Sequence, residues 1–279
     1  MASILTFEPV LRGAAFLGVL ALMLGAEAVW PKRPRLNPRR KRWLTNLSLM
    51  GAGTILSRLM AVLPAPIAAT AAAAFAAAHG FGLLHWLDWP SWIDGLTTLL
   101  ALDFAVWVQH WAFHKSDTLW RLHSVHHADR EIDATTALRF HPLEIGLSVL
   151  FKSAVVLALG APIAAVIVFE VLLNACAMFN HANTSLPPAL ERAVRLVLVT
   201  PDLHRIHHSV RREEHDANFG FCLSLWDRVF GLLRPRPLDG DLGMTIGLAG
   251  HQDERPAQLS WSLRAPFIAG QGGGRDHRL

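Results

Sequence analysis

Residues 110–127 read HWAFHKSDTLWRLHSVHH and hold five of the chain's 15 histidines. The first two are four residues apart, and the last three form an HxxHH triplet. A second HxxHH triplet occupies residues 204–208. Positions i, i+3 and i+4 share one face of a helix, so each triplet is predicted to point its imidazoles at one place. The clustered residues are His110, His114, His123, His126, His127, His204, His207 and His208.

This histidine pattern predicts a metal centre. Neutral imidazole is the commonest metal ligand in proteins, and His181, at the end of an apolar segment, adds a ninth candidate. Nine ligands exceed what one ion uses, so the count indicates two metals. The ligand type alone leaves Zn, Cu, Fe and Ni open. Only two cysteines occur, without a CxxC pattern, which excludes a cysteine zinc site. A solvent-exposed histidine face is the alternative, and the repeated triplet disfavours it.

The composition predicts a membrane protein. Of the 279 residues, 52% are hydrophobic and 17% charged, against about 25% charged in soluble domains. Apolar segments at 10–30, 92–114, 143–160 and 162–181 approach or reach the roughly 20 residues that span a bilayer, and the last two are predicted to form a hairpin. We therefore expect an all-α, multi-span membrane helical bundle with a cytosolic, helical, histidine-rich cap.

The first apolar segment is interpreted as a retained anchor. Ala26-Glu27-Ala28 resembles a signal-peptide cleavage site. However, residues 32–42 contain seven Lys or Arg and no acid, which places the loop 31–43 in the cytosol by the positive-inside rule. Nucleic-acid binding by this run is disfavoured, and no nucleic-acid partner is expected.

The stretch 44–91 is predicted to cross the membrane once in net. Pro64 and Pro66 must break or bend it, and a single crossing keeps His114 on the same side as the basic loop. The predicted organisation is an anchor with its loop, a proline-broken membrane region, a metal-binding domain and a tail, at residues 1–43, 44–96, 97–250 and 251–279.

Polar residues near the histidines are candidates for orienting or additional ligands. Asp103 lies almost two turns before His110 within a span, where an acid is costly and suggests function. Metal-bound histidines usually donate their other N–H to a carboxylate or carbonyl. His215 is interpreted as a surface residue. The candidates for additional ligands or orienting groups are His141, Asp103, Glu170, Asn174, Asp216 and Asn218, while Asp227 and Arg228 are expected to tie the last helix to the histidines or to cap it.

Over residues 97–250 the sequence resembles the fatty acid hydroxylase and sterol desaturase superfamily of integral membrane enzymes. The resemblance covers over half of the chain and is specific, because residue types and their order both match. The matching motifs are His110-x-x-x-His114, Leu119-Trp120-Arg121-x-His123-x-x-His126-His127, Arg139-x-His141-Pro142, His204-x-x-His207-His208-Ser209, Asp216-x-Asn218-Phe219-Gly220 and Leu225-Trp226-Asp227-Arg228-Val229-Phe230-Gly231.

The resemblance implies a function. It implies two iron ions held by the nine histidines and facing the cytoplasm, with O₂ as co-substrate, that hydroxylate or desaturate a lipid. Electrons would come from a separate reductase, ferredoxin or cytochrome-type donor. Sterols, hopanoids, carotenoids, fatty acyl chains and ether lipids all remain open as substrates. The alternatives are a zinc-dependent membrane hydrolase, which lacks an HExxH motif here, and a metal carrier, whose ligands should lie near the membrane midplane.

Overall fold

The computed structural model describes residues 2–35, 38–63 and 65–268, with side chains from residue 8 onward. This part of the chain is helical and contains no β-strand longer than an isolated bridge. The all-α prediction is therefore confirmed. The long helices are α1 (Ala2–Val29), α2 (Arg39–Ala61), α3 (Ala69–His79), α4 (Ser91–Lys115), α6 (Pro142–Leu159) and α7 (Ile163–His181).

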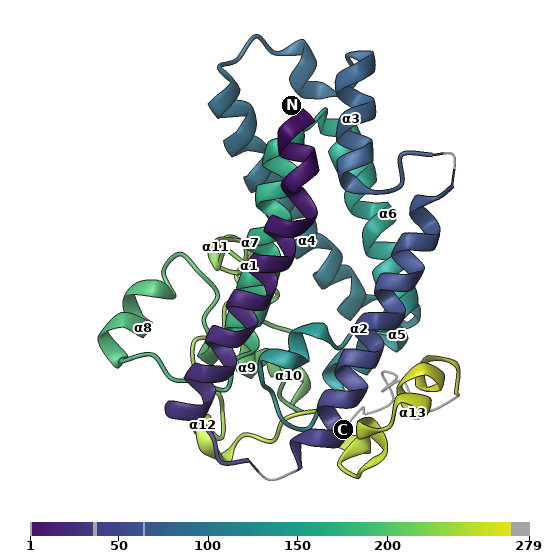
Figure 1. Cartoon of the computed structure of the whole chain (residues 1–279). Coiled ribbons are helices and arrows are strands. Elements are labelled where there is room, and N and C mark those ends of the chain that lie inside the picture. Colours follow the sequence, from purple (N-terminus) through teal and green to yellow (C-terminus); the bar gives the residue numbers. More distant parts are fainter. Residues whose placement is uncertain (1, 36–37, 64, 269–279) are drawn as a thin grey trace.

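Most of the short elements gather at one end of the long helices, opposite the N-terminus of the chain (Figure 1). The exception is η1, which precedes α4 at the other end. The short elements are η1 (Leu83–Trp86), α5 (Asp117–His127), η2 (Ala134–Leu138), α8 (Pro188–Val194), α9 (Pro201–His207), α10 (Arg212–His215), α11 (Leu225–Val229), α12 (Gly240–Gly243), η3 (Ala249–His251), η4 (Arg255–Ala257), α13 (Leu259–Arg264) and η5 (Ala265–Phe267).

Four helices in the described residues are long and apolar enough to cross a membrane: Glu8–Val29, Ser91–Lys115, Pro142–Leu159 and Ile163–His181. Their bounds lie within two residues of the predicted segments. Their outer faces carry exposed apolar side chains, such as Leu17 and Leu22 at 65% each. Such faces suit lipid rather than water, so the multi-span helical bundle is confirmed.

The core of the bundle lies between α3, α4, α6 and α7. Ala69, Ala72 and Ala73 of α3 are buried against Val156 of α6 and Phe169 of α7. Small side chains let membrane helices approach closely, which explains the alanine-rich composition of α3. The helix therefore acts as a packing element beside the predicted hairpin of α6 and α7.

The loop in the basic segment is shorter than predicted, because helix α2 already begins within the predicted loop 31–43. Helix α2 begins at Arg39, directly after Pro38, because Arg and Lys are good helix formers and Arg42 finds buried carboxylates (below). Lys32 lies 3.1 Å from Asp202, so this loop sits at the histidine-rich end. The basic loop and the end of α4 thus lie at the same end of the bundle, which agrees with one net crossing over residues 44–91 followed by the return crossing of α4.

The predicted C-terminal tail is largely folded as far as the structure describes it. Trp261 of α13 is only 6% exposed and clusters with Trp120 and Ala265. Apolar side chains at these positions bury against α5, so residues 259–267 pack on the histidine-rich end. The sequence predicts disorder only for the last ten residues, and these lie outside the described residues.

The hairpin turn and the η1 segment meet at two glycines. Gly160 ends α6 with φ +68°, and Gly82 has φ +107°. A Cβ atom on Gly82 would lie 2.2 Å from the backbone nitrogen of Gly160. No side chain fits there, so this contact holds the far end of the bundle together.

We predict that Gly82→Ala destabilises the protein by about 2 kcal/mol or more, because it adds an unfavourable φ to a backbone clash. The measurement is the thermal unfolding midpoint in detergent. Gly95→Ala is the control, since its Cβ meets open space on α4 and alanine favours a helix by about 0.5–1 kcal/mol. An unchanged midpoint in Gly82→Ala would contradict the close contact.

Candidate metal centre

The structure brings all nine predicted histidines together at the buried end of α4, α5, α7 and α9. They form two groups, and within each group one nitrogen from every ring lies within 4.8 Å of the others. The five-histidine group consists of His110, His114, His123, His127 and His207, and the four-histidine group of His126, His181, His204 and His208.

Each HxxHH triplet divides between the two groups. His123 and His127 join the five-histidine group, whereas His126 joins the other; His204 and His208 stay together, and His207 crosses over. The prediction that each triplet aims at one place is wrong in this respect. Helical residues advance about 100° each, so i+4 lies about 40° to one side of i and i+3 about 60° to the other. Each triplet therefore serves both groups.

The spacing of the ring nitrogens fits ions. In the five-histidine group, the Nε2 atom of His110 lies 3.0 Å from that of His207 and 3.1 Å from that of His123. In the other group, the Nε2 atom of His181 lies 3.0 Å from that of His204 and 3.1 Å from that of His126. Ligands about 2.1 Å from one ion are separated by about 3.0 Å in an octahedron and about 3.4 Å in a tetrahedron.

Backbone and carboxylate oxygens fix the orientation of several rings. The Nδ1 atoms of His110, His207 and His181 lie 2.7, 2.8 and 2.7 Å from the carbonyl oxygens of Phe219, Ala217 and Ala177. A carbonyl oxygen only accepts, so each Nδ1 carries the proton and each Nε2 presents a lone pair to its group. This arrangement is the usual way in which proteins orient metal-binding histidines.

Several buried ring nitrogens lack any partner among the described residues. Both nitrogens of His114 and of His127 are unpaired, as is Nδ1 of His204 and of His208. An unsatisfied buried polar group costs about 1–3 kcal/mol, so these unpaired nitrogens destabilise the folded protein when no metal is bound. An ion in the five-histidine group would satisfy one nitrogen each of His114 and His127. In the four-histidine group it is the 3.0–3.1 Å spacing of the Nε2 atoms that fits an ion, so the donor set fits a pair of metals.

The rings are neutral at ordinary pH. Burial, reinforced by the neighbouring rings, lowers the pKa of His126, His127 and His208 well below the ordinary histidine value, and burial lowers the pKa of His123 to about 3. A metal binds the neutral imidazole, so these rings can bind metal without first losing a proton.

Comparisons with known proteins agree with this geometry. The fatty acid hydroxylase family model matches residues 95–232. An ornithine lipid hydroxylase from Rhizobium tropici is 28% identical over 57% of this chain and 48% of its own length. The alkylglycerol monooxygenases of Homo sapiens and Danio rerio are each 30% identical over 52% and 54% of this chain, and over 32% and 33% of their own lengths.

The chain belongs to the fatty acid hydroxylase superfamily. The family match includes the histidines of α4, α5, α7 and α9. The chain spans about half of the ornithine lipid hydroxylase and about a third of the alkylglycerol monooxygenases. No solved structure matches the chain.

Two polar residues position the turn that orients these hydroxylase-family histidines. Asp227 accepts hydrogen bonds of 2.9 Å from the backbone amides of Phe219 and Gly220. Asn218, with φ 55°, donates to the carbonyl oxygen of Leu203 at 2.9 Å. The turn thereby presents its carbonyl oxygens to His110 and His207, so Asn218 and Asp227 act through the backbone rather than on a ring.

The sequence interpretation missed Glu144. Its carboxylate lies 2.6 Å from Nδ1 of His123, at the first turn of α6, and it is the one acid in direct hydrogen-bond contact with a grouped histidine in the described residues. The signal was available, because an acid within an apolar span is the same feature that pointed to Asp103. Both side chains are buried, so their contact fixes the orientation of the His123 ring. Glu144 is therefore an orienting group.

Asp103 and His141 lie outside both groups. Asp103 accepts a 2.8 Å hydrogen bond from the indole of Trp226, so it ties α4 to α11 instead of holding a ring. His141 caps α6 through a 3.2 Å contact between its Nδ1 and the amide of Leu143. Both side chains thus hydrogen-bond residues other than the grouped histidines, and neither is a member of a group.

The remaining candidates differ in their distance from the rings. Asp216 lies 3.7 Å from Nδ1 of His114, so it suits an orienting role. Glu170 instead contacts Arg12 and Lys152, and the Asn174 side chain donates to the backbone oxygen of Glu170. Sharing a helical face with His181 did not bring these two residues to the rings, because α7 continues about 16 Å into the bundle between Glu170 and His181.

His215 is not the surface residue that the sequence suggested. Its ring stacks on Trp120 at 5.3 Å and lies 6.0 Å from the ring of His114. It belongs to neither group. The short helix α10 folds back over α9, which is why a residue outside the motifs reaches the edge of the centre.

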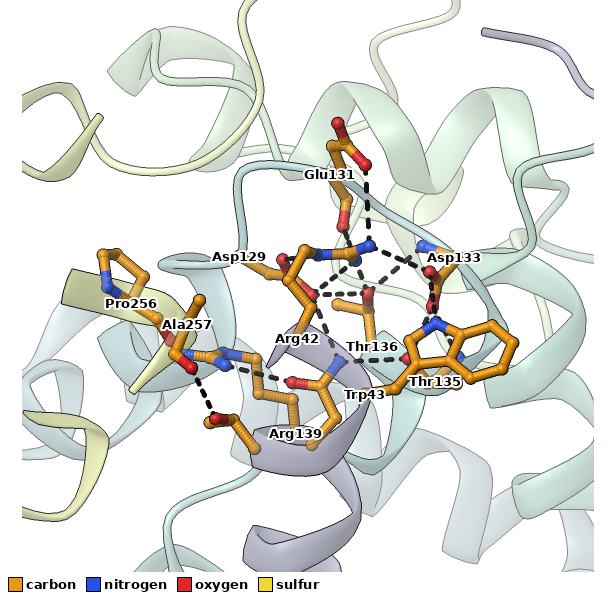
Figure 2. A network of polar contacts seen from close by, with 12 residues as sticks. Arg42, Trp43, Asp129, Glu131, Asp133, Thr135, Thr136, Arg139, Pro256 and Ala257 are labelled. Atoms are coloured by element: carbon orange, nitrogen blue, oxygen red, sulfur yellow. Dashed lines mark hydrogen bonds and ion pairs between the residues drawn. The ribbon is translucent and has the colours of Figure 1, made fainter. Parts of the chain in front are cut away.

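A buried polar network braces α5 from the side of α2 (Figure 2). Arg42 donates to both carboxylate oxygens of Asp129, at 2.6 and 2.9 Å, and to Asp133 at 3.0 Å. Although burial alone would raise it, the Arg42 guanidinium lowers the pKa of Asp129 to about 2. Arg139 donates to the carbonyl of Val125 within α5 at 2.7 Å. The network thus fixes the helix that carries the first triplet.

A cavity of about 750 Å³ opens beside the five-histidine group. His110 and His123 lie at one end of its lining, and helices α1, α2, α4, α6 and α7 supply most of the rest. Phe16, Phe113 and Phe140 are among the apolar lining residues. Its size and mainly apolar walls fit a small-molecule or lipid site.

We predict that His207→Ala lowers bound metal from about two equivalents to about one, since it removes a ligand from the five-histidine group only. His204→Ala should remove the other equivalent. Metal analysis of the purified protein measures both, with His79→Ala of α3 as the control outside the groups. Full metal content in either cluster variant, or equal loss in His79→Ala, would contradict the two-site arrangement.

Proposed function

We propose that the chain is a membrane-bound di-iron oxygenase that hydroxylates or desaturates a lipid. The observation that carries the proposal is the pair of adjoining buried histidine groups, one of which lies at the end of a mainly apolar cavity between the membrane-spanning helices. The similarity to an ornithine lipid hydroxylase and to alkylglycerol monooxygenases supports lipids as the substrate class.

The five- and four-histidine groups would each hold one iron ion. A di-iron centre supplies the reduction of O₂ and the cleavage of an unactivated C–H bond. In a hydroxylation, one oxygen atom enters the C–H bond and the other leaves as water, with two electrons and two protons consumed. In a desaturation, two hydrogens leave the lipid and both oxygen atoms become water. A separate reductase, ferredoxin or cytochrome-type donor would supply the electrons.

The chain's own residues bind, orient and exclude water. The carbonyl oxygens of Phe219 and Ala217 and the Glu144 carboxylate hold the rings at fixed tautomers. The apolar walls of the cavity would align an alkyl chain beside His110 and His123. Fixed alignment of two reactants lowers the barrier by avoiding the entropy cost of bringing them together.

The metal centre is proposed to face the cytoplasm. The basic loop that includes Lys32 and Arg33 lies at the histidine-rich end, where Lys32 pairs with Asp202. Positive loops remain on the cytoplasmic side of a membrane, where electron donors are available. Zinc hydrolase and metal-carrier functions are disfavoured, because the relatives are named as lipid oxygenases.

We predict that a membrane-impermeant maleimide added to intact cells labels Trp86→Cys but not Arg236→Cys. Trp86 is 81% exposed at the end opposite the histidines, whereas Arg236 lines a surface hollow with Asp216. Permeabilised cells, and the parent chain with Cys176 and Cys222, provide the controls. Labelling of Arg236→Cys from outside would reverse the proposed orientation.

The function is tested by lipid mass spectrometry of a host with and without the protein under ¹⁸O₂. We expect one lipid class to gain a labelled hydroxyl or to lose two hydrogens. His126→Ala should abolish the change while inserting into the membrane normally, and His79→Ala should retain it. An unchanged lipid profile, with iron bound and a donor supplied, would overturn the proposed activity.

A further inference from the structure

Charged side chains lie within the membrane-spanning helices, away from the histidines: Lys152 and Glu170 near the middle of α6 and α7, and Arg12 one turn into the span of α1. Lys152 of α6 and Arg12 of α1 both contact Glu170 of α7, and Arg12 also pairs with Glu8 at 2.8 Å. Charges inside a membrane are costly and mark functional sites by default. Helix packing alone therefore does not explain why these charged side chains are present in the spans.

The cations face the cavity, whereas their acidic partners do not. Arg12 and Lys152 line the large cavity, together with Arg58 of α2, but Glu8 and Glu170 are absent from its lining. Within the described residues, Arg58 has no hydrogen-bond or ion-pair partner. This end of the cavity consequently presents three positive side chains, without an equal number of negative ones.

The two ends of the cavity are separated by an apolar stretch. Glu144, which contacts His123, and Lys152 both lie on α6, eight residues or about 12 Å apart along the helix. Ile145 and Val149 of α6 and Leu173 of α7 line the cavity between them. Ser148 of the same stretch also lines the cavity, where it accepts a 2.7 Å hydrogen bond from Gln109. The cavity thus joins a metal-binding end to a cationic end through mainly apolar walls.

We infer that the cavity binds an amphiphile with one anionic group, a phosphate or a carboxylate, held by Arg12, Arg58 and Lys152. Its alkyl chain extends along the apolar walls to His110 and His123. Charge complementarity favours this occupant over a neutral lipid, because charge-assisted hydrogen bonds contribute more than neutral ones. The identity of the ligand as a substrate rests on the proposed oxygenase function.

The separation of the two ends also predicts where the lipid is oxidised. An extended chain advances about 1.25 Å per carbon, given a C–C bond of about 1.5 Å. A distance of about 12 Å then corresponds to roughly ten carbons. Oxidation is expected on a carbon remote from the anionic group rather than next to it.

The test measures binding, which needs no turnover. The purified, metal-loaded protein in neutral phosphatidylcholine nanodiscs is first loaded with a fluorophore-labelled long-chain fatty acid. Palmitate, hexadecyl phosphate and hexadecanol then compete for the site, so that the carboxylate and phosphate arms are separated from a neutral chain of equal length. We expect both anions to compete at least about tenfold better than the alcohol.

The diagnostic variant is Arg58→Gln, since it leaves the contacts of Glu170 intact. It should weaken palmitate or hexadecyl phosphate about tenfold or more while leaving hexadecanol unchanged. Arg40→Gln is the matched control, because Arg40 is an exposed arginine on the same helix and outside the cavity. Equal competition by the anions and the alcohol in the parent protein, or equal weakening of all three in Arg58→Gln, would overturn the inference.

The binding result and the activity result are independent. Charge-selective binding without any oxidised lipid would refute the proposed function and retain the anionic subsite. Oxidised lipid without charge-selective binding would support the function and refute the subsite. Mass spectrometric location of the new hydroxyl or double bond next to the anionic group would contradict the predicted position of oxidation.

Discussion

The structure depends on the convergence of nine buried imidazoles, seven of which bring their Nε2 atom to within 3.0–3.3 Å of the Nε2 atom of another ring. Neutral rings that direct lone pairs at each other repel, and burial denies them water. Only positive charge between them makes the arrangement favourable. The folding free energy of the surrounding helices must therefore compensate for the unfavourable approach of the rings when no ion is bound.

The surrounding helices use two kinds of support. Oxygens behind the rings, from Phe219, Ala217, Ala177 and Glu144, set the tautomers. A buried ion network centred on Arg42 then holds the segment that follows α5, through Asp129 and Asp133, against α2. Buried ion pairs contribute little net stability but are costly to leave half-formed. Such a network suits a region that must adopt one arrangement of its ligands.

Sequence reasoning located the spans to within two residues and identified the nine histidines that the structure assembles. It succeeded because apolar length and local spacing are properties of a few neighbouring residues. It did not foresee the crossing of His126 and His207 between groups, because that depends on how α5 and α9 face each other. The role predicted for Asp103 fails for the same reason. Helical spacing puts Asp103 on the face of His110, but the indole of Trp226, from a distant segment, donates a hydrogen bond to its carboxylate.

The division of each triplet between two groups has a consequence for how the cavity beside them can diversify. The two groups are kept apart within single turns of α5 and α9, by the angle between i+3 and i+4. The cavity, by contrast, is walled by α1, α2, α4, α6 and α7. The walls supplied by α1 and α2 carry none of the nine histidines, so they can change without altering the spacing of the two groups, and one histidine cluster can be combined with cavities of different shape.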